Sequence, residues 1–141
     1  GTGNVACGFL KGYGIKAGAV ALSIAHDSHN IIVVGVSDEE MEFAVNSLIA
    51  QEGGMVLVRE GKVLESMPMP IAGLMSDQSG EWVDEKLTAI HAKAYEELGI
   101  AGDVEPVMTL CFMSLAVIPE VKLTDMGLFD VTTFSFIPVE A

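Results

Sequence analysis

The chain has 141 residues, half of them apolar, and its 20 acidic and 7 basic side chains give a formal net charge of −13. This composition is enough for a single domain, residues 1–141, with a substantial hydrophobic core, and it excludes intrinsic disorder. A surface this acidic repels phosphate backbones and anionic lipids, so we expect neither nucleic acid nor a membrane as a partner. Cys7 and Cys111 match no metal-binding spacing, and we therefore expect a reducing, cytoplasmic setting.

Two short apolar runs, residues 19–24 and 31–36, predict buried strands because they contain many β-branched side chains and no proline. Between them lies the sequence AHDSHN, residues 25–30, which holds two of the three histidines. Polar side chains between two core strands are costly unless they find partners. We therefore interpret this stretch either as a hydrogen-bonded corner or as a functional site.

The next segment predicts an amphipathic helix. Ser37 and Glu40 have the spacing of a capping box, and Gly53-Gly54 is a typical helix end. The apolar residues between them repeat at the spacing of one buried helix face: Met41, Ala44, Val45, Leu48 and Ile49. Residues 55–58 and 62–65 then flank a glycine-containing turn, which predicts a β-hairpin.

The prolines in residues 67–70 exclude a central strand, and we expect residues 71–75 to form a short buried connector. A second helix is expected to begin at Asp77 or Ser79 and to end at Gly99. Its apolar face is Val83, Leu87, Ile90, Ala94 and Leu98.

The last third of the chain is less decisive. Residues 107–118 are almost wholly apolar and fit a strand or a helix equally well. We expect a turn at residues 122–127 and a final strand at residues 131–139. The complete order of elements predicts an α+β fold, with a mixed or antiparallel β-sheet packed against two main helices.

The AHDSHN stretch is the only close cluster of residue types suited to catalysis or metal binding. Histidine and aspartate together can hold zinc, iron or manganese, which makes His26 and His29 weak candidates for metal ligands. A metal site needs three or four ligands, however, and no second cluster supplies the others. A serine-histidine-aspartate triad from Ser28, His29 and Asp27 is also disfavoured, because adjacent residues rarely converge in the required geometry.

Several blocks of the sequence resemble the C-terminal domain of bacterial adenine deaminase. They occur in the same order and cover nearly the whole chain: GTGN at 1–4, GYGIK at 12–16, GAVA at 18–21, AHDSHN at 25–30, MPIAGLMSD at 69–77 and VIPEVKLTD at 117–125. The AHDSHN and PIAGLMSD blocks are the most specific of these.

The resemblance implies a longer amidohydrolase whose (β/α)₈ barrel uses manganese or iron to hydrolyse adenine to hypoxanthine and ammonia. The HxH metal-ligand motif of that barrel is absent from this chain, so we expect the chain alone to be inactive. The partners implied are adenine, the catalytic barrel and further copies in a homo-oligomer.

The resemblance also suggests a role for His26, Asp27, Ser28, His29 and Asn30. Because barrel active sites open at one face, where neighbouring domains can cover them, these residues are candidates to complete the pocket. Two other functions stay open, namely a non-catalytic interface or oligomerisation module and a freestanding small-molecule-binding domain. Apolar anchors around the stretch would favour an interface, whereas a concave polar pocket would favour ligand binding.

Overall fold

The structure is a computed structural model that describes residues 3–140; residues 1–2, which begin the GTGN block, and residue 141 lie outside this range. The main sheet has four antiparallel strands in the order β2-β1-β3-β4. These strands are β1 (Ala19–Leu22), β2 (Ile32–Gly35), β3 (Gly54–Arg59) and β4 (Lys62–Pro68). The helices are α1 (Asp38–Ala50), α2 (Gly80–Glu96) and α3 (Met108–Cys111).

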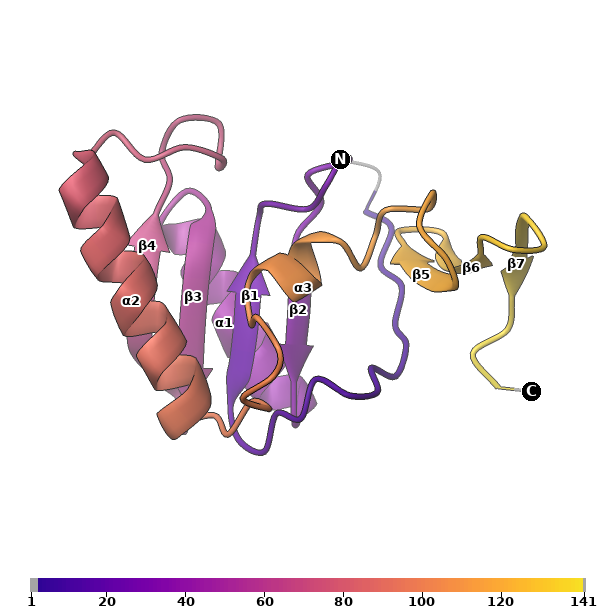
Figure 1. Cartoon of the computed structure of the whole chain (residues 1–141), viewed down its shortest axis with the longest axis horizontal. Helices are drawn as coiled ribbons and strands as arrows, with labels where there is room; N and C mark the ends of the chain where they lie inside the picture. The colour runs from indigo at the N-terminus through magenta and orange to yellow at the C-terminus, as the bar shows by residue number, and fades with distance from the viewer. Residues whose placement is uncertain (1–2, 141) are drawn as a thin grey trace.

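A second, smaller antiparallel sheet lies beside the first (Figure 1). It consists of β5 (Val121–Thr124), β6 (Gly127–Asp130) and β7 (Ser135–Ile137). The expected α+β fold is confirmed, and both sheets are antiparallel rather than mixed.

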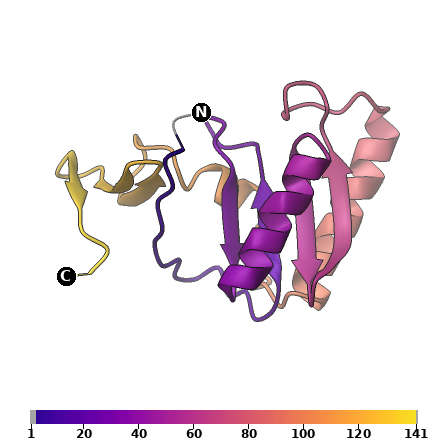
Figure 2. The same cartoon turned by 180° about the vertical axis from the view of Figure 1, so that it is seen from behind.

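The main sheet is the middle layer of three. Helices α2 and α3 cover one face (Figure 1), and α1 covers the other (Figure 2). The alternation of side chains along β1 explains this arrangement, because successive residues of a strand point to opposite faces. Ala19 and Ala21 join the cluster beneath α1, whereas Val20 and Leu22 join the cluster beneath α2 and α3.

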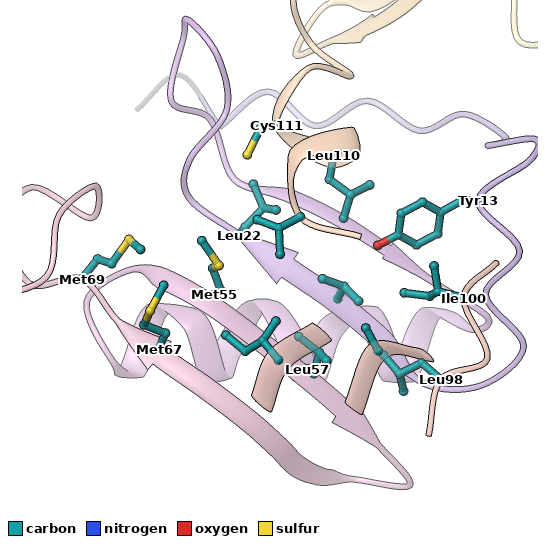
Figure 3. Packing of buried hydrophobic residues seen from close by; sticks show 14 residues of the cluster. Tyr13, Leu22, Met55, Leu57, Met67, Met69, Leu98, Ile100, Leu110 and Cys111 are labelled. Carbon is teal, nitrogen blue, oxygen red and sulfur yellow. The ribbon is translucent and has the colours of Figure 1, made fainter. Parts of the chain in front are cut away.

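The larger cluster connects distant parts of the chain to the sheet (Figure 3). At one end, the buried Tyr13 hydroxyl donates a hydrogen bond to the Pro106 carbonyl oxygen at 2.7 Å. At the other end lie the thioethers of Met55, Met67 and Met69. Methionine side chains fill irregular gaps well. They pack this end of the core, where two loops leave the ends of the strands.

The first predicted helix is confirmed, with one change to its cap and one to its buried face. The Ser37 hydroxyl accepts a hydrogen bond from the Glu40 N–H at 3.3 Å. The Glu40 carboxylate accepts instead from the Glu60 N–H at 2.6 Å, so it links α1 to the hairpin turn. The expectation of a buried Ile49 is wrong, since this side chain is 58 % exposed. It lies about 100° around the helix from the buried Leu48.

The hairpin and the second helix are also confirmed. Glu60 and Gly61 form the turn between β3 and β4, both with positive φ, as a two-residue turn requires. Ser79 caps α2 by accepting from the Trp82 N–H at 3.3 Å. Pro68 lies at the end of β4, an edge strand, where a missing N–H is tolerated.

None of the helices within residues 3–140 is long and apolar enough to cross a membrane.

The sequence was a poorer guide to the C-terminal third. Residues 107–118 hold the short helix α3 followed by turns. The expected turn at 122–127 is confirmed only at residues 125–126, where it joins β5 and β6 in a hairpin; the residues on either side of it are strands. The expected strand at 131–139 shrinks to β7. The Asp130 carboxylate accepts hydrogen bonds from the N–H groups of Thr132 and Thr133, and this Asx-type turn interrupts the strand.

Replacing Ser37 with alanine removes the acceptor that satisfies the Glu40 N–H at the start of α1. We expect the free energy of unfolding to fall by about 0.5–2 kcal/mol, as measured by urea denaturation of the chain. Ser37→Asp keeps an acceptor and should retain most of the stability. An unchanged midpoint in Ser37→Ala would contradict the cap.

An ion pair joins α2 to the edge strand β4: the Lys86 ammonium donates to the Glu65 carboxylate at 2.7 Å. Burial raises the pKa of Glu65, but hydrogen bonds from Lys86 and from the Ser66 N–H outweigh it and leave the pKa below its ordinary value. A carboxylate of this kind stabilises the fold above its unfolded pKa, and its contribution is lost as the pH falls through the folded pKa.

Glu65→Gln should therefore reduce stability at pH 7, by at most about 1 kcal/mol for a pair that solvent reaches. The difference from the wild type should shrink as the pH falls below 4.5, the ordinary pKa of a glutamate. Glu85→Gln is the control, because Glu85 is exposed and has no ion pair within the described residues. A difference between wild type and Glu65→Gln that stays constant from pH 7 to pH 3 would exclude this contribution.

Candidate functional site

The polar residues 26–30, here called the HDSHN loop, lie beyond the end of β1 and are all exposed. Their backbone is nevertheless held firmly. The His26 N–H donates to the Cys111 carbonyl oxygen at 2.8 Å, and the His29 N–H donates to the Ala25 carbonyl oxygen at 2.7 Å. Ala25 is fully buried at the base of the loop. The loop is thus anchored through its backbone, and its side chains face solvent.

The side chains of the HDSHN loop make no hydrogen bond or ion pair with any part of the described chain. The one ring contact is between His26 and Phe112, which stack with centroids 5.4 Å apart and planes inclined by 19°. The interpretation of this stretch as a corner held together by hydrogen bonds of its side chains is therefore wrong. The strand ends are joined by backbone groups, and the polar side chains stay available for contacts outside this domain.

A second loop, residues 69–77, lies at the same end of the sheet (Figure 1). Ser23, at the end of β1, connects the two. Its hydroxyl donates to the Gly73 carbonyl oxygen at 2.5 Å and accepts from the Gly54 N–H at 2.8 Å. The backbones also touch, since a Cβ added to Gly53 would lie 2.6 Å from the Cα of Gly73. Because Gly53 also has a positive φ of 101°, glycine is needed there.

The structure corrects the expectation that residues 71–75 form a buried connector. Ile71 and Met75 are 45 % and 58 % exposed, and their backbones exchange hydrogen bonds at 3.2 Å across a tight turn. The AHDSHN and PIAGLMSD blocks therefore lie at the same end of the sheet, and Ser23 bonds the second of them to the end of β1. The turn-forming residues Pro70 and Gly73 were a signal of an exposed loop, but the apolar residues of the segment obscured it.

The described residues do not assemble a metal or nucleophile site of their own. No three histidine, cysteine, aspartate or glutamate side chains within residues 3–140 gather where they could hold a metal ion, so His26 and His29 lack further protein ligands there. Burial raises the pKa of the Cys111 thiol, and the nearby Glu105 adds to the rise. A protonated thiol is a poor nucleophile.

The HDSHN loop is also open to solvent. Two grooves run along β2, and residues 26–30 line neither of them. The loop is thus anchored, lies outside both of these grooves and presents exposed polar side chains.

The chain belongs to the adenine deaminase C-terminal domain family, whose model matches residues 1–135. It is 74 % identical over 140 residues to adenine deaminase 2 of Desulfotalea psychrophila, covering 99 % of this chain and 24 % of that protein. It is 53 % identical over 135 residues to an adenine deaminase of Halalkalibacterium halodurans, covering 96 % of this chain and 23 % of that protein. The chain therefore spans about a quarter of the length of these relatives.

The different bonding of two serines near the site can be tested directly. Ser23→Ala should lower the free energy of unfolding by about 1–3 kcal/mol, because it leaves the Gly54 N–H without its acceptor. Ser28→Ala in the exposed loop should change stability by less than about 0.5 kcal/mol. Both values come from chemical denaturation. Equal losses in the two variants would show that the loop side chains do bond within the domain.

Proposed function

We propose that this chain is the C-terminal domain of an adenine deaminase, which hydrolyses adenine to hypoxanthine and ammonia, and that the HDSHN loop completes its active site. The family match and the relatives named adenine deaminase support the activity. The observation that carries the role of the loop is its bonding: the backbone is fixed, whereas the polar side chains make no hydrogen bond or ion pair within residues 3–140.

Groups held in advance at a fixed position are the ones that accelerate a reaction, because they need not reorganise during it. The HDSHN loop offers groups complementary to adenine. An imidazole N–H of His26 or His29 can donate to a ring nitrogen of the purine, and the Asp27 carboxylate can accept from the exocyclic amino group. The loop, lying over the pocket in the assembled enzyme, would also exclude water other than the reacting molecule.

The metal ion would belong to the preceding part of the enzyme, since the described residues lack a donor set for one. Manganese or iron bound there would activate the attacking water. The HDSHN loop would act on the purine rather than on the metal, by orienting the ring and holding the amino group that leaves as ammonia.

A second function, a contact surface for another domain, is favoured by apolar side chains at the same end of the sheet. Ile31, Ile71 and Met75 are each between 45 % and 58 % exposed and could anchor such a contact. This function is compatible with the first, because a loop that covers a pocket also touches its rim. A freestanding small-molecule binder is less favoured, because the grooves along β2 do not include the loop.

The same proposal includes a cytoplasmic, homo-oligomeric enzyme. The free thiols of Cys7 and Cys111 fit a reducing compartment. Sedimentation of the full-length protein would determine its oligomeric state.

In the full-length enzyme, Asp27→Asn and His29→Ala should each lower kcat/KM for adenine by about 10²-fold or more, the range for a lost proton-transfer or positioning group. Their melting temperatures should match the wild type, because both side chains are exposed. Asp103→Asn is the matched control, since Asp103 is exposed on another turn. Wild-type kinetics in both loop variants would leave only the contact-surface function.

The 141-residue chain alone, supplied with manganese or iron, should release no ammonia.

A further inference from the structure

A groove of about 780 Å³ runs along the outer edge of β2, separate from the HDSHN loop. Its walls are the N-terminal residues 8–11, the edge strand and the small sheet. Figures 1 and 2 show the N-terminal segment passing between β2 and the small sheet. Most of the lining is apolar, including Leu110, Met113 and Leu128.

The strand edge inside this groove is unpaired. β2 is the outermost strand of the main sheet, and the Val36 N–H points toward β1, where it donates to the Gly18 carbonyl oxygen at 3.1 Å. Because backbone groups alternate in direction along a strand, those of Val33 and Gly35 point into the groove. No partner for them occurs within residues 3–140. Such an edge is a template for an added extended segment.

The groove also holds the one buried charged side chain of the described residues. Lys122 is 9 % exposed, and its ammonium has no hydrogen bond or ion pair within residues 3–140. In contrast, Arg59, Lys86 and Lys93 each pair with a glutamate. The stem of Lys122 is buried, whereas its ammonium is not one of the buried unpaired atoms of the described residues and reaches solvent at the groove. A carboxylate in a segment lying in the groove would complement this free ammonium.

The small sheet beside the groove lacks a second layer. Its strands are three or four residues long, and no helix or other strand of the described chain packs broadly on it. Phe134 and Phe136 are 78 % and 52 % exposed, and Phe9 across the groove is 94 % exposed. Short three-stranded sheets need a packed face for stability, so this surface is expected to be covered in the intact protein.

We propose that the groove binds an extended, carboxylate-bearing segment of the polypeptide that precedes residue 1 in the full-length enzyme. This inference rests on the proposed function only in placing the chain at the C-terminal end of a longer protein. The segment adds to the free edge of β2, pairs with Lys122 and covers the apolar lining.

The preceding polypeptide is favoured over a second copy for two reasons. The relatives are about four times as long as this chain, and the connection enters through the N-terminal segment, which is itself a wall of the groove. A tethered segment has an effective concentration in the millimolar range. A second copy would bring a further −13 charges against an equally acidic surface.

Zero-length carboxyl–amine cross-linking of the full-length enzyme, followed by peptide mass spectrometry, tests this assignment. We expect Lys122 to be joined to a carboxylate located before residue 1 of the same molecule. Lys62 is the control, because it is exposed in the hairpin and has no ion pair within the described residues. Mixing isotopically light and heavy enzyme separates intramolecular links from links between copies. A link between copies, or no link at Lys122, would overturn the proposal.

Charge reversal supplies a second measurement. Lys122→Glu should speed proteolytic cleavage around residues 3–11 of the full-length enzyme at least tenfold, because the segment is expelled, whereas Lys62→Glu should not. Lys122→Met keeps an apolar side chain in place of the buried aliphatic part of Lys122 and removes only the charge. It therefore tests the charge if Lys122→Glu fails to fold. Equal cleavage in Lys122→Met and the wild type would contradict the proposed pairing of Lys122 with a carboxylate.

Adenine turnover by the same enzyme, before cross-linking, separates the two proposals. Turnover without a Lys122 link would refute the groove and keep the function. A Lys122 link in a protein without turnover would keep the groove and refute the adenine deaminase activity.

Discussion

The structure depends on the complete burial of β1 between two layers of helices. All four of its side chains are at most 1 % exposed, so both faces of the sheet must be covered. The alanines on one face allow α1 to pack closely, and the larger Val20 and Leu22 fill the space beneath α2 and α3. Because β1 is fixed on both faces and on both edges, the residues that follow it start from a rigid point. The HDSHN loop starts there.

The loop makes little physical sense as a stabilising element. Exposed polar side chains without partners add almost nothing to stability, and the stable contacts at this end come from backbone groups and from Ser23, which a shorter and less polar loop could also provide. Stability therefore does not explain five polar side chains in this position. The proposed role in contacts outside the domain would explain them, and the neighbouring loop 69–77, held through Ser23, would enlarge the surface available for such contacts.

The layered part of the fold could be predicted from the sequence because each of its elements carries a local signal. The caps at Ser37 and Ser79 and the turn at Glu60-Gly61 mark the ends of elements, and apolar periodicity marks the faces. The small sheet had no comparable signal. Its strands are too short to show an alternation, and the Asx-type turn after Asp130 depends on side-chain hydrogen bonds rather than on apolar pattern. The contact of Ser23 with Gly73 spans 50 residues, so no local rule reveals that loop 69–77 packs against the end of β1.

If both proposals hold, the loop and the groove would also depend on each other energetically. The side chains of the HDSHN loop could act on a ligand only once the domain is in place. A segment held in the groove along β2 would fix the position of the domain. Its apolar burial and its pairing with Lys122 would offset the entropy lost on fixing that position. Every contact of the loop would then act at a fixed distance. In this arrangement, changes at Lys122 would weaken substrate binding and turnover without altering any residue that touches the substrate.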